Sequence, residues 1–154
     1  MNDHQHAIDI EASADDVFAY VSDVGNMPSY LPTTQRVENL GKDRIHVEGE
    51  ARGHRYKADG YLRCDTAKRH MEWGSDGDRK YHGQLEVREA GPGRSNVTVR
   101  IHFDLHDQER TEMEQQPGGV DGVLSRGIQA SLESIRNQCE GKGGKVEPPE
   151  ATGG

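Results

Sequence analysis

The central part of the chain alternates between apolar and polar positions. Between Thr34 and His106, where we expect about six strands, apolar or small residues recur at every second position in several successive runs. Members of this set are Ile45, Val47, Gly49 and Ala51; Tyr56, Ala58, Gly60, Leu62 and Cys64; Met71 and Trp73; Tyr81, Gly83, Leu85 and Val87; and Val97, Val99, Ile101, Phe103 and Leu105. A period of two is typical of strands with one buried face. Gly, Asp and Pro turns separate the runs, so the pattern predicts an antiparallel meander with one wet face.

The N-terminal part predicts a strand followed by two short helices. His6 to Glu11 alternate as a strand. Ser13 is a candidate N-cap, and the periodicity changes there to that of a helix reaching about Asp23. We expect Gly25 and Asn26 to end this helix. Pro28 then suits the first turn of a second, very short helix before Pro32 stops it.

The C-terminal part predicts one long helix. Its apolar stripe consists of Val120, Val123, Leu124, Gly127, Ile128, Leu132 and Ile135. The segment before it, residues 107–118, is polar and ends in Pro117-Gly118. We expect residues 1–139 to form one domain and residues 140–154, which are rich in Gly, Lys, Glu and Pro, to form a disordered tail.

These elements predict an α+β fold, in which a curved antiparallel sheet of about seven strands wraps around the C-terminal helix. The middle of the predicted inner face is small where a filled core would carry Leu or Ile, at Gly49, Ala58, Gly60 and Gly83. Such glycines leave volume for a ligand, or they are bulge positions that curve the sheet. Both interpretations give a concave sheet around a helix.

Composition narrows the class of protein. Only 31% of the residues are hydrophobic, and the formal net charge is -8, which disfavours a general nucleic-acid surface. No apolar run has the length of a membrane span, and MNDHQHAIDI lacks the features of a signal peptide, so we expect a cytoplasmic protein. Cys64 and Cys139 lack metal-ligand spacing, and we expect two unpaired thiols.

The predicted inner face carries little ionisable chemistry. Four residues on or near this face combine an aromatic ring with a polar group: Tyr30, Tyr56, Trp73 and Tyr81. They either contact a ligand or are ordinary core aromatics. His102 and His106 share a face, but four residues along a strand separate them by about 13 Å, too far for one ion. We therefore expect no metal site, and no cofactor-binding motif is present.

The chain resembles the START/polyketide cyclase superfamily, the SRPBCC or helix-grip proteins that include the birch-pollen-allergen-like fold. The similarity covers about residues 5–139. It is carried by IDIEASADDVFAYVSDVGNMPSYLP and by GVLSRGIQASLESIRNQ, which stands where the family has its long C-terminal helix. The resemblance implies a cavity between sheet and helix for an apolar, aromatic or lipid-like ligand. Residues 107–118 are more polar than this family pattern, which leaves open whether they close the cavity.

We expect ligand contacts from residues on the inner face, the second short helix and the C-terminal helix. They are Tyr30, Val47, Gly49, Tyr56, Ala58, Trp73, Tyr81, Leu85, Val99, Ile101, Phe103, Leu124 and Ile128. Tyr30 is expected to line or cap the cavity mouth, away from bulk solvent.

Three functions remain open at this stage. The first is a binding protein for a small apolar or aromatic ligand, as a monomer or weak homodimer without nucleic-acid partners. The second is an enzyme of the polyketide cyclase/dehydrase type, with a tyrosine or His54 moving a proton. The third is a co-chaperone-like interaction module that uses the wet outer face.

Overall fold

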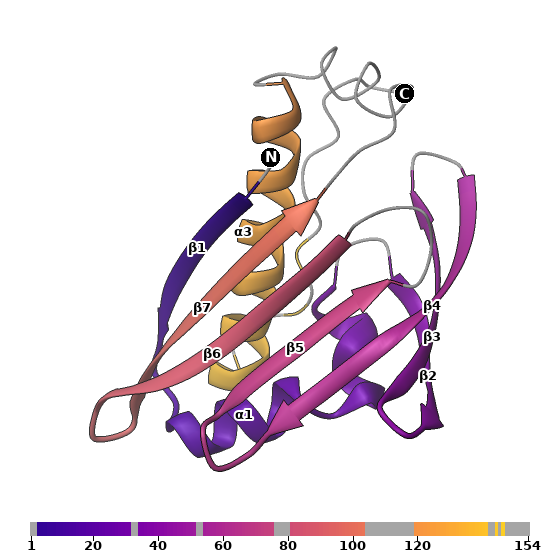
Figure 1. The fold of residues 1–154 in the computed structure, drawn as a ribbon. Helices are drawn as coiled ribbons and strands as arrows, with labels where there is room; N and C mark the ends of the chain where they lie inside the picture. The colour runs from indigo at the N-terminus through magenta and orange to yellow at the C-terminus, as the bar shows by residue number, and fades with distance from the viewer. Residues whose placement is uncertain are drawn as a thin grey trace.

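The computed structural model describes residues 3–31, 34–51, 54–75, 81–103, 119–141, 144 and 146, although not every side chain within these ranges. Its centre is a seven-stranded antiparallel sheet of order β1-β7-β6-β5-β4-β3-β2 (Figure 1). The strands are β1 (Asp3–Ile10), β2 (Thr34–Gly41), β3 (Arg44–Ala51), β4 (His54–Asp65), β5 (His70–Ser75), β6 (Tyr81–Gly91) and β7 (Arg94–Phe103). The predicted meander is confirmed, and β1 joins it beside β7.

The register places the alternating residues on one face, as the sequence predicts. Leu85 pairs with Val99 and Met71, and Leu62 pairs with Trp73. The first strand begins earlier than predicted, at Asp3, because its backbone continues to pair with β7 as far as His102. That pairing partner is distant in sequence, so the local pattern around His6 could not show it.

The first helix, α1 (Ala14–Val21), begins as predicted. The N–H of Asp16 donates to the Oγ of Ser13 at 3.1 Å, which caps the helix. The predicted ending at Gly25 and Asn26 is wrong, because a new helical turn, the 3₁₀ helix η1 (Val24–Ser29), already begins at Val24. Asp23 caps this turn by accepting from the N–H of Gly25 at 2.9 Å, and Pro28 lies inside it.

The C-terminal helix α3 (Gly119–Glu140) has 22 residues and packs mainly against β1, with a smaller contact to α1. Gly141, with φ of 69°, takes the left-handed conformation that follows many helices. Two described residues beyond it return to α3: Val146 N–H donates to Ser134 Oγ at 2.7 Å, and Asn137 donates to the Gly144 carbonyl at 3.2 Å. The predicted domain boundary at residue 139 and the disordered tail stay predictions.

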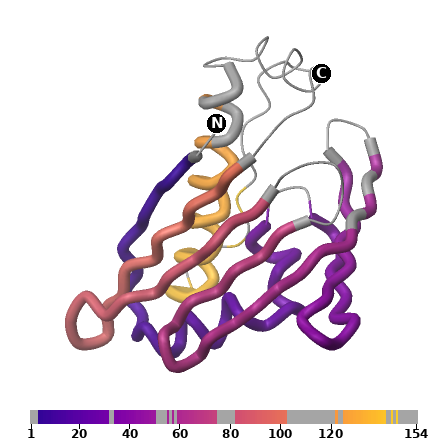
Figure 2. The backbone as a smooth tube through the Cα atoms, in the orientation of Figure 1, coloured from indigo at the N-terminus to yellow at the C-terminus, as the bar shows by residue number. Residues whose placement is uncertain are grey.

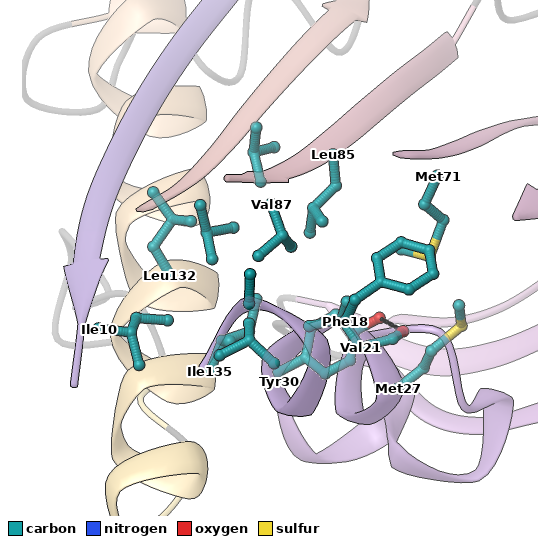
Figure 3. Close-up of a cluster of buried hydrophobic side chains, with 14 of the residues drawn as sticks. Ile10, Phe18, Val21, Met27, Tyr30, Met71, Leu85, Val87, Leu132 and Ile135 are labelled. Carbon is teal, nitrogen blue, oxygen red and sulfur yellow. Dashed lines mark hydrogen bonds between the residues drawn. The ribbon is translucent and has the colours of Figure 1, made fainter. Parts of the chain in front are cut away.

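The hydrophobic core lies at the end of the sheet that α1 and η1 cover. The turns after β4 and β6 lie at this same end (Figures 1 and 2). Side chains from three layers meet there, from the helices, the inner face of the sheet and α3 (Figure 3). They include Ile10, Phe18, Val21, Met27, Tyr30, Met71, Leu85, Val87, Leu132 and Ile135. The fold is therefore the predicted helix-grip arrangement, closed at one end by its two short helices.

Candidate functional site

Burial on the inner face decreases from the α1 end of the sheet towards the opposite end. Val87 and Val97 form the first pair across β6 and β7, and both are buried. Leu85 and Val99 form the next inner-face pair and are also buried. One pair further from α1, Gly83 stands opposite Ile101, and Ile101 is only partly buried. The inner face therefore becomes accessible about midway along these strands.

Trp73 and Val47 are also partly exposed, on two other strands of the inner face. Trp73 is the register partner of both Leu62 and Gly83, and it packs against the edge of the core. A Cβ atom placed on Gly83 would lie only 2.5 Å from Cζ2 of Trp73, so the indole lies directly across the glycine. Val47, on β3, is also partly buried. Trp73, Val47 and Ile101 are thus partly exposed apolar residues of the inner face, and we call this set the inner platform.

Most of the predicted ligand residues fall into three groups. Val47, Trp73 and Ile101 make the inner platform. Gly49 belongs to none of the groups and is buried in register with Thr34. Leu85, Val99 and Ile128 are core residues. The side chains of five others lie outside the described residues: Tyr56, Ala58, Tyr81, Phe103 and Leu124. The same is true of His54 and of residues 107–118. Their ligand contacts stay predictions.

Tyr30 is 2% exposed and does not face bulk solvent, as expected. Its hydroxyl donates to the Val21 carbonyl at 2.7 Å (Figure 3). Burial raises the pKa of this hydroxyl, so it is a neutral donor at physiological pH. Its polar group is already engaged in joining η1 to α1. A role for Tyr30 in ligand binding stays a prediction.

Both cysteines are free thiols, as expected. Burial is the main cause that raises the pKa of Cys64, and it raises the pKa of Cys139 to about 11. Because the thiolate is the nucleophile, neither environment activates sulfur for catalysis. Among the described residues, no three His, Cys, Asp or Glu side chains gather as metal ligands. None of the described helices combines the length and apolar character needed to cross a membrane.

The outer face carries ionisable residues at the positions between the apolar ones. His46, for example, contacts Asp59 through Nδ1 at 2.5 Å and Glu48 through Nε2 at 3.0 Å.

Two open hollows also lie among polar residues. One, of about 320 Å³, is lined by Arg63, Cys64, Asp65, Lys68, His70 and Glu72. The other, of about 420 Å³, is lined by Tyr61, Glu72, His82, Gly83, Gln84, Arg100 and His102.

Sequence reasoning missed the contact between His82 and His102, whose rings stack with centroids 4.8 Å apart. A signal was present: both residues lie ten positions from Pro92, the centre of the predicted hairpin turn. Counting outwards from such a turn pairs residues across the two strands. The spacing argument for a metal site paired His102 only with His106, four positions further along the chain, and did not consider the neighbouring strand.

Comparison with known proteins agrees with this architecture. The profile of the family described as "Polyketide cyclase / dehydrase and lipid transport" matches residues 1–140. None of the curated proteins searched matches the chain.

Solved structures share the fold at low sequence identity. The Zhui aromatase/cyclase from Streptomyces sp. R1128 has a TM-score of 0.74 and 18% identity, covering 90% of this chain and 93% of that one. A START superfamily protein from Mycobacterium smegmatis has a TM-score of 0.68 and 14% identity, covering 88% and 97%.

The di-domain aromatase/cyclase BexL, from the BE-7585A biosynthetic pathway, has a TM-score of 0.73 and 21% identity. The match covers 91% of this chain but only 47% of BexL, so the chain spans about half of that di-domain protein. The expected START/polyketide cyclase resemblance is confirmed by the profile and by these folds. The chain belongs to the polyketide cyclase/dehydrase and lipid transport family.

Proposed function

We propose that this protein binds a small apolar or aromatic molecule between the sheet and α3, on the inner platform of Val47, Trp73 and Ile101. The observation that carries the proposal is the change in burial along the inner face. The α1 end is a closed core, whereas the next row of apolar side chains is left partly exposed. Apolar surface left open beside a packed core is a common feature of ligand sites.

The chemistry of the platform favours a ligand with an extended apolar or aromatic surface. The indole of Trp73 lies across Gly83, where no side chain separates it from the sheet. An aromatic face and two aliphatic side chains on the same face of the sheet offer area for burial, at about 25 cal/mol per Å² of apolar surface removed from water. Family membership supports the same class of ligand, because the family description includes lipid transport.

Binding without catalysis is the simpler function for the described inner face, which carries few ionisable groups. The inner rows formed by Leu62, Trp73, Gly83 and Ile101, and by Met71, Leu85 and Val99, contain no Asp or Glu. On β1 these rows continue to His4 and His6, the register partners of Ile101 and Val99. Cyclase or dehydrase activity remains the alternative, and it would depend on His54, Tyr56 or Tyr81. Replacement of either tyrosine by Phe would then abolish turnover while ligand binding is retained.

Fluorescence titration tests the proposal, because Trp73 is the one tryptophan in the chain. We would titrate the protein with a panel of aromatic polyketide-like compounds and fatty acids and record Trp73 emission together with the melting temperature. Saturable emission shifts with a raised melting temperature are expected, since a ligand that binds only the folded state stabilises it. A panel that changes neither quantity would contradict the proposal.

A matched pair of variants locates the site on the inner face. Ile101→Asp places a carboxylate on the platform and is expected to weaken binding about tenfold or more, because burying that charge against an apolar ligand is unfavourable. Thr98→Asp adds the same charge to the opposite face of β7. It should leave the affinity within about twofold. Equal affinities in both variants would place the ligand elsewhere.

A further inference from the structure

Two rows of side chains cross the outer face of the sheet from β4 to β7. The first row consists of successive register partners Tyr61, Gly74, His82 and His102. The second consists of Arg63, Glu72, Gln84 and Arg100. The hollow of about 420 Å³ lies over these two rows, on the face opposite the inner platform.

Gly74 leaves a gap in the first row, and Tyr61 leans into it. A Cβ atom on Gly74 would lie 2.5 Å from Cε1 of Tyr61, so the phenol ring already occupies that space. The guanidinium of Arg63 lies over the same ring, 5.1 Å from its centroid. Tyr61 thus borders the hollow on one side, while the stacked rings of His82 and His102 border it on the other.

The charges around this hollow are unequal. Glu72 is its one described carboxylate, and this group contacts His70 Nε2 at 3.2 Å and stands in register with Arg63. At the other end of the row, Arg100 is exposed and forms no ion pair or hydrogen bond within the described part of the chain. The free guanidinium therefore lies beside two imidazoles and the amide of Gln84. Hydrogen-bond donors dominate at this end.

The groups around the hollow favour an anion over a metal ion. The two imidazole rings are stacked and inclined by only 19°, and among the described residues no three His, Cys, Asp or Glu side chains gather as metal ligands. A neutral imidazole can donate one N–H, so His82 can share an oxyanion with the guanidinium of Arg100. A planar guanidinium nearby is the group best suited to an oxyanion.

We propose that this outer-face hollow is a binding site for a small oxyanion, a carboxylate or a phosphate group, held by Arg100 and His82 beside the stacked ring of His102. The site is separate from the inner platform, because the two lie on opposite faces of the same strands. It therefore does not depend on the proposed function of the inner face.

NMR of the imidazole ring protons tests the site directly. Inorganic phosphate and acetate would be added separately to the whole protein at constant pH, with chloride holding the ionic strength constant. We expect saturable shifts of the His82 and His102 signals, with millimolar affinity and little change at His70. A response to only one anion would assign the site to phosphate or to carboxylate ligands.

Variants distinguish this site from general charge effects. Arg100→Gln should weaken anion binding about tenfold, since it removes a charge-assisted hydrogen bond. Arg88→Gln is the matched control, because Arg88 lies on the neighbouring strand and pairs with Glu86 at 3.0 Å. It should leave the affinity unchanged.

Three results would overturn the proposal. The first is the absence of saturable shifts at anion concentrations on the order of 100 mM, far above a millimolar dissociation constant. The second is equal binding by the two arginine variants. The third is a response of both histidines to zinc ions but not to either anion.

Discussion

The indole of Trp73 lies directly across the backbone of Gly83 on the neighbouring strand. The contact is so close that a Cβ atom on Gly83 would lie 2.5 Å from the ring. In the register, Gly83 separates Trp73 from Ile101, so the glycine provides the space in which the ring rests. A missing side chain on one strand thereby positions an aromatic side chain on the next.

Replacement of Gly83 by alanine should displace this ring. We expect a shift in Trp73 emission and a loss of about 1–3 kcal/mol of unfolding free energy from overpacking. Gly127→Ala is the control, because a Cβ there meets nothing within 4 Å. In a helix that change should stabilise by up to about 1 kcal/mol. Denaturant unfolding with fluorescence detection measures both, and equal stabilities with unchanged emission would contradict the contact.

Tyr30→Phe should destabilise the fold. The change removes the donor to the Val21 carbonyl, and a buried acceptor left without its partner costs about 1–3 kcal/mol. Tyr20→Phe is a matched control, because the Tyr20 hydroxyl contacts Ser29 at a partly buried position and water can replace it. Urea unfolding should show the larger loss for Tyr30. A larger loss for Tyr20 would show that the buried bond is not the important one.

Ser13→Ala should weaken the start of α1. Loss of the hydroxyl that accepts from the Asp16 N–H is expected to cost about 1 kcal/mol. Ser13→Asp retains an acceptor at the N-terminus of the helix and should restore most of the stability. Thermal unfolding of the three proteins provides the test. Equal melting temperatures for wild type and Ser13→Ala would show that the cap contributes nothing.

His46 should make stability depend on pH. Its hydrogen bond to Asp59 is the largest cause that raises its pKa above the ordinary value of 6.5, and Glu48 acts in the same direction. A raised folded-state pKa adds stability that is fully present below the unfolded value of about 6.5 and is lost as pH rises through the folded value. The melting-temperature difference between wild type and His46→Asn should therefore shrink above about pH 6.5.

The control for this pH effect is Arg94→Gln on β7, which breaks the exposed pair with Glu11, away from His46 on β3. Its difference from wild type should stay constant from about pH 6 to pH 8, because the variant keeps His46 and its contacts to Asp59 and Glu48. A difference for His46→Asn that stays constant or grows over the same range would contradict the assignment.

The local pattern was sufficient to predict most of the elements. Alternation predicted β3 to β7, since only one face of an antiparallel sheet is buried. The Ser13 cap also follows from adjacent residues. The boundary between α1 and η1 was not predicted correctly, because Asp23 caps a new turn that begins before Gly25. Local competition between backbone and side-chain hydrogen bonds decided that position.

The candidate site was predicted less completely than the fold. The alternation of apolar and polar positions correctly placed Trp73 and Ile101 on the inner face. It gave no reason to separate them from Leu85 and Val99, which were also ligand candidates but are buried in the core. Their difference in exposure depends on where α1 and α3 pack. The outer hollow was missed because it requires Gly74, His82 and His102 to be neighbours across three strands.

The sequence by itself therefore determined which side of each strand is apolar, where the turns fall and which segments are helical, because these depend on residues close together in the chain. Only the tertiary structure decided which apolar residues close the core and which remain partly exposed. It also decided that Tyr30 donates into the core and that the rings of His82 and His102 stack. Burial and contacts between strands arise from packing of distant segments, which no local pattern specifies.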